Sequence, residues 1–373
     1  MASMPRSPAR PPPRSIAPRT TEHRTTEHWR ALGRRALLAG GLASALAGPP
    51  AAAATADWAR FKELYLAPDG RVIDTGNGGI SHSEGQGYGL LFAVAWDDPA
   101  SFERILGWTS RTLRRPTDAL HAWRYVPGAP QPVADLNNAT DGDILIAYAL
   151  SLAARRWGEP DRAAAAAAIA RDILRLTVRP MGARLLLLPG ANGFERQDEA
   201  VVNPSYYIFP ALAELADRAP SPLWAPLVAD GTALIDDGRF GRWRLPPDWL
   251  SIARPGGALA PAAAWPPRFS YDAIRVPLNL AWGNLPVPAA AADFLAFWSD
   301  FPPPRMPAWV DLRDNALAAY PALPGMQAVA QFARAAWRGT PTADPPPPGA
   351  MTASYYSAAL ALLTRIATRD RGG

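Results

Sequence analysis

Three distant segments of this chain share one design, in which an acidic residue stands where an apolar helical pattern begins. Glu84 does so in SHSEGQGYGLL, Asp141 in NNATDGDILIA, and Asp272 in SYDAIRVP. The helix dipole favours an acid in the first turn of a helix. If the three helices run parallel around a common centre, their N-termini open at one end of the molecule. The three carboxyl groups would then meet in a single cleft.

Helical periodicity dominates the chain. Segments 84–96 and 139–157 are apolar nearly all round, which is typical of inner helices, whereas 160–178 mixes Arg, Asp and Ala and is typical of an outer helix. This alternation predicts an all-α fold, an (α/α)6 barrel, with a few short strands in its loops, one of them at 184–188. The expected helices are 57–66, 84–96, 99–114, 139–157, 160–178, 205–218, 221–236, 271–282, 290–300, 313–320, 325–338 and 352–368.

Composition excludes several function classes. The chain has no cysteine, so disulfides, thiol catalysis and Cys-ligated zinc are ruled out. Residues 1–35 hold eight Arg and two Glu, whereas the remainder holds 30 basic and 31 acidic residues and is nearly neutral. A neutral body argues against nucleic acid as a partner, because nucleic acid requires a clustered basic surface. It suits a neutral polymer such as a polysaccharide.

Beyond residue 35, the only histidines are His82 and His121. A histidine-rich metal site is therefore not expected, and neither is a catalytic triad that depends on histidine. We expect no metal and no organic cofactor.

The first 56 residues read as a leader. An arginine pair at 34–35 precedes a short apolar run from Ala36 to Ala47, and small residues follow at 51–56. A charged region, a short apolar region and a small-residue cleavage site are typical of a signal peptide, and the paired arginines suggest the twin-arginine route. A disordered Arg/Pro/Ala-rich tail is the alternative. The apolar run is too short to span a bilayer.

The expected organisation is thus a signal peptide and leader over 1–56, followed by one catalytic domain over 57–373. We expect export to the periplasm or the medium, with the mature chain starting between Ala51 and Asp57. No stable membrane insertion is expected after cleavage.

Each acid also has a purely structural interpretation. Glu84 follows Ser81 by three residues, which is the spacing of a capping box, and Asp141 follows Asn138 by the same interval. Asp143 is expected to be a cap or an outer-face acid. Glycines at 85, 87 and 89 favour a functional interpretation of the first segment. Glycine there costs helix stability, and close approach of a ligand or a neighbouring helix is the usual reason to accept that cost.

Aromatic residues gather around the same segments. Sugar rings present C–H faces that stack on aromatic rings, although each of these residues taken alone could equally be core. Trp123 lies among polar loop residues and is the best candidate for the cleft. The aromatic residues are Tyr88, Trp123, Tyr125, Tyr206, Tyr207, Trp265 and Tyr271.

In combination and in this order, the motifs SEGQGYG, ATDGD, NPSY and YDAIR resemble the family 8 glycoside hydrolases, which are (α/α)6 barrels. The likeness covers most of the chain after the leader. It is nearest to the branch of periplasmic endoglucanases that accompany bacterial cellulose synthase. Segment 243–269 is rich in Pro, Ala and Gly and departs from the family pattern.

The resemblance implies a role for each matching residue. Glu84 stands at the position of the proton donor and Asp272 at that of the general base. Asp141 matches the acid that binds and distorts the sugar, and Tyr206 matches the tyrosine that helps to hold the attacking water. Arg275 would orient or charge-balance Asp272. Tyr88, Trp123 and Tyr271 complete the expected substrate-binding set, with Trp123 as a stacking platform.

The resemblance also implies an activity, that of an endo-β-1,4-glucanase hydrolysing cellulose by an inverting mechanism with two carboxylates. A β-glucan is the expected partner. We also expect a functional association with the cellulose synthase machinery, and we expect the protein itself to be a monomer. The residues leave open a chitosanase, xylanase or mixed-linkage glucanase of the same fold. They also leave open a non-catalytic glucan-binding protein of an export route.

An inverting mechanism needs Glu84 protonated and Asp272 ionised. The helix N-terminus lowers the pKa of Glu84, whereas burial near Tyr88 and the charge of Asp141 raise it, and the second pair must prevail. Arg275 is expected to keep Asp272 ionised. The two carboxyl groups of an inverting enzyme stand roughly 6.5–9.5 Å apart.

Overall fold

The computed structural model describes residues 49–341 and 346–372, so most of the expected leader lies outside the described residues. The described chain is mainly helical. Its helices are α2 (Pro49–Tyr65), α3 (Ser83–Ala95), α4 (Pro99–Thr112), α5 (Thr140–Trp157), α6 (Pro160–Thr177), α7 (Phe209–Arg218), α8 (Trp224–Asp237), α9 (Arg275–Trp282), α10 (Ala290–Asp300), α11 (Pro324–Arg338) and α12 (Tyr355–Asp370), with 3-10 turns η1 (Pro204–Tyr206) and η2 (Pro303–Arg305).

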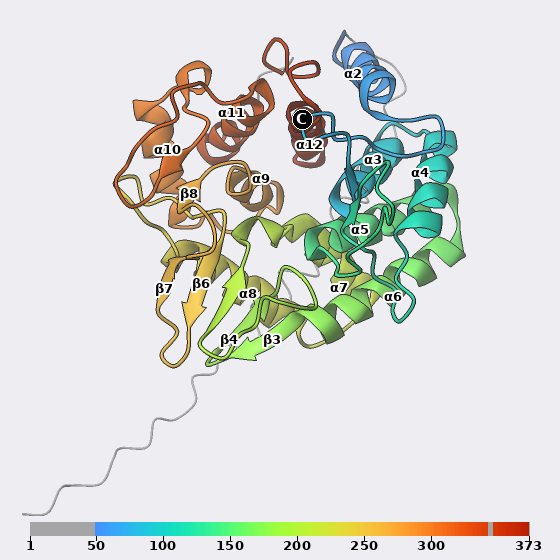
Figure 1. Cartoon of the computed structure of the whole chain (residues 1–373). Coiled ribbons are helices and arrows are strands. Elements are labelled where there is room, and N and C mark those ends of the chain that lie inside the picture. Colours follow the sequence, from blue (N-terminus) through green and yellow to red (C-terminus); the bar gives the residue numbers. More distant parts are fainter. Residues whose placement is uncertain (1–48, 342–345, 373) are drawn as a thin grey trace, which may run out of the picture.

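The helices follow one another around a ring (Figure 1). Consecutive helices pack together, as α3 does with α4 and α5, and α11 does with α12. The ring closes where α2 contacts α12, and there Arg365 Nε donates to Asp57 Oδ2 at 2.8 Å. Every residue of α9 and nearly every residue of α3 is buried, whereas α4 and α6 bury only a stripe. The predicted (α/α)6 barrel of inner and outer helices is confirmed.

Short antiparallel strands fill the connections. The hairpin of β3 (Val178–Met181) and β4 (Arg184–Leu187) confirms the strand predicted at 184–188. The unassigned segment 243–269 contributes most of a three-stranded sheet and one strand of a pair. The remaining strands are β1 (Ser81–His82) paired with β2 (Arg124–Tyr125), β5 (Glu199–Val202) with β6 (Leu250–Ala253) and β7 (Leu259–Pro261), and β8 (Arg268–Phe269) with β9 (Val310–Asp311).

The helix predicted at 313–320 is wrong, because this segment is a turn. Asp311 Oδ1 accepts the N–H of Arg313 at 2.9 Å, and Asp314 Oδ1 accepts the N–H of Ala316 at 2.9 Å. Asn315 adopts a left-handed conformation with φ 64°. Asp and Asn side chains that bond the backbone two residues ahead stabilise turns at the expense of helix.

Two other helices begin later than predicted. The segment 205–218 is divided into η1 and α7, and the helix expected from 271 begins only at Arg275. Asp272 therefore lies in the turn before α9 and not in its first helical turn. Its position depends on tertiary contacts of that turn, which are described below.

Candidate active site

Glu84 lies in the first turn of α3, and His82 is the N-cap of that helix. Nδ1 of His82 accepts the N–H of Gly85 at 3.0 Å. The capping box with Ser81, the alternative interpretation of Glu84, is not formed, because the Ser81 hydroxyl instead donates to the carbonyl of Val72. Glu84 is thus fixed at the start of a buried helix by a histidine cap.

Helices α3 and α5 pack closely at their N-terminal ends, which carry Glu84 and Asp141. A Cβ added to Gly142 would lie 2.2 Å from Ser83 Oγ and 2.7 Å from the backbone N of Glu84, and one added to Gly87 would lie 2.6 Å from Leu145 Cβ. Gly87 and Gly142 are therefore required by the packing of these two helices, and for Gly87 this is one of the two reasons that the sequence suggested. This packing sets Asp141, in the first turn of α5, beside the start of α3.

Asp272 is positioned by a second carboxylate that sequence reasoning missed. Asp248 Oδ1 accepts the N–H of Ser270 at 3.1 Å and that of Ala273 at 2.7 Å, so it fixes the turn that carries Asp272. Asp248 is buried and lies in the segment that departs from the family pattern. The only sequence signal was an acid among apolar and proline residues, without helical periodicity.

Arg275 brings the three predicted acids together. Its Nη2 lies 2.6 Å from Asp272 Oδ1, its Nη1 lies 3.5 Å from Asp141 Oδ2, and Nη1 also forms an ion pair with Glu84 Oε1. The Arg275 side chain is only 7% exposed. Glu84, Asp141 and Asp272 therefore share one site, as the pattern of acids before apolar helices predicted.

The carboxyl groups have strongly altered acidity. Burial raises the pKa of Asp141 to about 7, against opposition from the Gly142 N–H and His82. Loss of hydration, followed by the like charges of Asp248 and Asp141, raises the pKa of Asp272 well above its usual range. Arg275 pairs with Asp272 as expected, yet the pKa of this carboxyl is raised. The Asp272 side chain keeps 33% of its surface exposed, so water reaches the Asp272 carboxyl group.

Asp143 is not the cap or outer-face acid expected from the sequence. It is fully buried, and its Oδ1 accepts the backbone N–H of His121 at 2.9 Å and lies 2.9 Å from His121 Nδ1. Its Oδ2 accepts Asn138 Nδ2 at 3.0 Å. These bonds account for both oxygens and give Asp143 a structural role.

Two of the expected substrate-binding tyrosines lie among the carboxylates. Tyr88 is 2% exposed, donates to Glu84 Oε1 at 3.1 Å, and accepts Arg275 Nη1 at 3.2 Å. Its ring thus has no face free for a sugar, and it supports Glu84 from behind. Tyr206 lies in η1, with its ring centre 5.9 Å from Arg275 Cζ. Burial keeps the pKa of its hydroxyl well above the usual value, so this group is a neutral donor toward Asp141.

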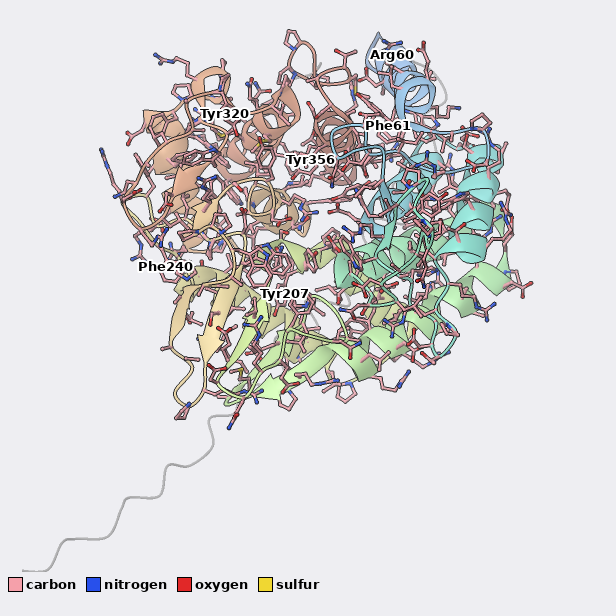
Figure 2. All side chains as sticks on the ribbon, in the orientation of Figure 1. Arg60, Phe61, Tyr207, Phe240, Tyr320 and Tyr356 are labelled. Carbon is pink, nitrogen blue, oxygen red and sulfur yellow. The ribbon has the colours of Figure 1, made fainter. Side chains whose placement is uncertain are left out.

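Trp123 and Tyr271 retain accessible surface. Trp123 is half-buried, its backbone carbonyl accepts the N–H of Ser83 at 3.1 Å, and its indole donates to Asp135 Oδ2 at 2.7 Å. Tyr271 is 39% exposed. Its carbonyl accepts the hydroxyl of Tyr356, and its own hydroxyl interacts with that of Tyr320. Tyr356 and Tyr320 are labelled in Figure 2.

The other aromatic candidates divide between core and surroundings. Tyr207 is fully buried, and its hydroxyl accepts the N–H of Leu187 at 3.0 Å. Tyr125 packs edge-on against Trp108, at 5.3 Å between ring centres. Trp265 stacks on Trp249, at 4.5 Å and 11° between ring planes.

Trp249 is the aromatic residue that sequence reasoning missed. Phe194 stacks on it at 5.8 Å, so that Phe194, Trp249 and Trp265 form a continuous aromatic stack. A hydrogen bond from Trp249 lowers the pKa of Asp272 against the larger effects that raise it. Trp249 therefore touches the catalytic candidate directly, although it belongs to the segment that the family pattern did not cover.

Within residues 49–341 and 346–372, no group of three or more His, Cys, Asp or Glu could hold a metal ion. In the same part of the chain, no helix has the length and hydropathy needed to cross a membrane.

The family model of the glycosyl hydrolases family 8 matches residues 32–370, which is nearly the whole chain. The protein belongs to glycoside hydrolase family 8. A probable endoglucanase from Novacetimonas hansenii is 47% identical over 327 residues, which cover 87% of this chain and 94% of the relative. An endoglucanase from Cellulomonas uda is 42% identical over 295 residues, which cover 79% and 82% respectively.

Solved structures agree with this assignment. The family 8 chain superposes on the endo-beta-1,4-glucanase CMCax from Acetobacter xylinum with a TM-score of 0.81 and 46% identity, covering 87% of this chain and 99% of that one. An endoglucanase from Komagataeibacter sucrofermentans gives a TM-score of 0.80 at 45% identity. As a member of family 8, the protein is a glycoside hydrolase, and enzymes of this class generally use a pair of carboxyl groups as acid and base.

Proposed function

We propose that this family 8 enzyme is an endo-β-1,4-glucanase that hydrolyses cellulose or related β-1,4-glucans with inversion, using Glu84 as general acid and Asp272 as general base. The observation that carries the proposal is the contact of one guanidinium, that of Arg275, with both carboxyl groups. Relatives that share more than 40% of their sequence with this chain are named endoglucanases, which supports the substrate class.

The two carboxyl groups have different tasks. Glu84 donates a proton to the leaving glycosidic oxygen, and Tyr88 orients it through the 3.1 Å hydrogen bond. Asp272 takes a proton from water on the opposite face of the sugar. A pKa raised toward the working pH makes Asp272 a stronger base than an ordinary aspartate. Arg275 moves from sharing both carboxylates to pairing mainly with Asp272 once Glu84 holds its proton.

Asp141 and Tyr206 serve the sugar at the cleavage point. Asp141 has a pKa of about 7, so near neutral pH it exchanges between donor and acceptor forms that can bond a sugar hydroxyl. Tyr206, neutral and next to Asp141, helps to hold the attacking water. Trp123 and Tyr271, which are partly exposed, provide stacking surfaces farther along the glucan.

The cellular setting forms part of the proposal. Residues 1–56 carry the features of an export signal, and we infer a periplasmic or secreted monomer that works alongside cellulose synthesis. In the structure α2 begins at Pro49, so cleavage near 51–57 would remove its first turns. Sequencing the N-terminus of exported protein tests this localisation, because an intact Met1 there would contradict cleavage of a signal peptide.

The activity is tested with a panel of polymers and two isosteric variants. Wild-type protein should release reducing sugar from soluble cellulose derivatives faster than from chitosan, xylan or mixed-linkage glucan. Glu84→Gln and Asp272→Asn should each lose about 10²–10⁴-fold in rate while remaining folded at the assay temperature. The matched controls Glu63→Gln and Asp161→Asn change exposed carboxylates and should keep full rate.

Each failure of this experiment has a distinct meaning. Near-normal rates in either active-site variant would overturn the assigned roles. Faster cleavage of another polymer would reassign the substrate to that polymer. Binding of glucan without any release of sugar would point to a non-catalytic protein.

A further inference from the structure

His82 lies between two carboxylates at the start of α3. Its Nδ1 accepts the N–H of Gly85 at 3.0 Å and stands 3.8 Å from Glu84 Oε2. Its Nε2 stands 3.5 Å from Asp74 Oδ2. The ring is held edge-on against Tyr355, at 5.8 Å between ring centres. The His82 side chain is 16% exposed, so this arrangement is largely shielded from solvent.

These contacts define the protonation state of the ring. A histidine nitrogen that accepts a hydrogen bond carries no proton, so Nδ1 is bare and the neutral ring holds its proton on Nε2. That proton faces Asp74, which is itself fixed, because its Oδ1 accepts the N–H of Gly76 at 3.0 Å and leaves Oδ2 toward the ring. Asp74 thereby selects the tautomer that can cap α3.

A histidine cap differs from the usual ones. Ser, Thr, Asp and Asn are the common N-caps, and their acceptor oxygens persist over the working pH range. Serines stand on both sides of His82, at 81 and 83, yet neither caps the helix. The acceptor of His82 is lost when the ring takes up a second proton, so this cap depends on pH.

We propose that His82 is a positioning residue for the proton donor Glu84 and that Asp74 orients it, so that the neutral ring both caps α3 and adds no second positive charge beside a carboxyl that already contacts Arg275. Protonation of the ring would remove the acceptor for Gly85. It would also place a cation 3.8 Å from Glu84 and favour the ionised carboxylate, which cannot donate a proton. Activity should therefore fall on the acid side.

Charged groups from several elements act on this ring. The carboxylates of Asp74, Glu84 and Asp141, from the loop before β1, α3 and α5, lie around the ring. Arg275, from α9, pairs with the other oxygen of Glu84. From α12, the buried hydroxyl of Tyr355 has no hydrogen-bond partner among the described residues.

Three variants separate the cap from its charge. His82→Asn supplies a cap oxygen that cannot be protonated, so its kcat should stay within about threefold of wild type at the optimum, and its acid limb should extend to lower pH. His82→Phe has no acceptor, and its kcat should fall at least about tenfold with little change in KM. Asp74→Asn removes the charge that favours the cation, so its acid limb should also move to lower pH.

The controls use the same loop and the same assay. Asp69→Asn, which changes an exposed carboxylate that accepts the N–H of Arg71, should leave the pH profile unchanged. Melting temperatures identify any variant that fails to fold. If His82→Phe does not fold, the acid limbs of His82→Asn and Asp74→Asn decide the matter.

Wild-type kinetics in His82→Phe would overturn the inference. An unshifted acid limb in His82→Asn would also overturn it. The same holds if kcat falls as far in His82→Asn as in His82→Phe. The inference rests on the proposed role of Glu84, which Glu84→Gln tests in the same assay. An active Glu84→Gln would overturn both. An inactive Glu84→Gln beside unaffected His82 variants would overturn only the role of His82.

Discussion

Nη2 of Arg275 lies 2.6 Å from Oδ1 of Asp272, three residues earlier in the chain. The same guanidinium contacts Glu84 and Asp141, so a single buried cation balances three carboxyl groups. Removing one partner of a buried ion pair leaves uncompensated charge and typically costs about 3–5 kcal/mol. We therefore expect Arg275 to be needed both for the stability of the site and for its chemistry.

Arg275→Met should lower the melting temperature, and more at pH 8 than at pH 5, because the carboxyl groups left behind can take up protons at the lower pH. Activity on soluble cellulose should fall at least about 10²-fold. Thermal melts at both pH values measure the first effect. Arg60→Met, which removes an exposed pair with Glu63 worth about 0–1 kcal/mol, is the control. Equal losses of stability at the two pH values would contradict the account.

Asp141 should make the protein less stable as pH rises. Its pKa is about 7 in the folded protein and about 3.9 in an unfolded chain, so between these values the folded state binds more protons. The stability that this group contributes is complete below about pH 4 and is lost as pH rises through 7. Asp141→Asn removes the penalty. Its melting temperature should exceed that of wild type by about 2 °C or more at pH 8 and not at pH 4, while its activity falls.

Gly142 is the tightest point between α3 and α5. Gly142→Ala would force a methyl group to within 2.2 Å of Ser83 Oγ and 2.7 Å of the Glu84 backbone, and overpacking of this kind costs about 1–3 kcal/mol. We expect a lower melting temperature and reduced kcat, because Glu84 is displaced. Gly107→Ala in α4 is the control. It meets only the flexible end of Arg111, at 3.0 Å, and should be neutral or stabilising.

Trp249 should influence the acid limb of the pH–rate profile through its hydrogen bond to Asp272. Its hydrogen bond lowers the pKa of Asp272, so Trp249→Phe, which keeps an aromatic ring but loses the N–H, raises that pKa further. Because the base must be ionised, the acid limb should move to higher pH. Trp265→Phe retains the contact between Trp249 and Asp272 and should leave the acid limb in place. An acid limb unchanged in Trp249→Phe would show that Trp249 does not act on the base.

Glu84 and Asp141 were visible in the sequence because each precedes a long apolar run, and such a run can only be an inner helix. The close approach of their helices follows from glycines that permit tight packing, and glycines at the start of the first helix are also visible in the sequence. The inner helices of the barrel were predictable for the same reason. A long helical segment that is apolar on every side is typical of a buried helix.

Asp248 and Trp249 could not be found in this way. They lie in a segment without helical periodicity, whose course is fixed by pairing of β6 with β5 and of β8 with β9, strands distant in sequence. The burial of Tyr88 was hidden for a related reason. A helix that is apolar all round does not reveal which side faces the cleft, and the depth of Tyr88 depends on Arg275, from the other side of the barrel.

The most direct test of the two-carboxylate account is the configuration of the sugar that the enzyme first releases. Proton NMR of a cello-oligosaccharide digest, recorded within the first minutes before mutarotation, distinguishes the anomers. With Glu84 as acid and Asp272 activating water on the opposite face, the new reducing end should appear first as the α-anomer. Initial appearance of the β-anomer would mean retention and would contradict the account.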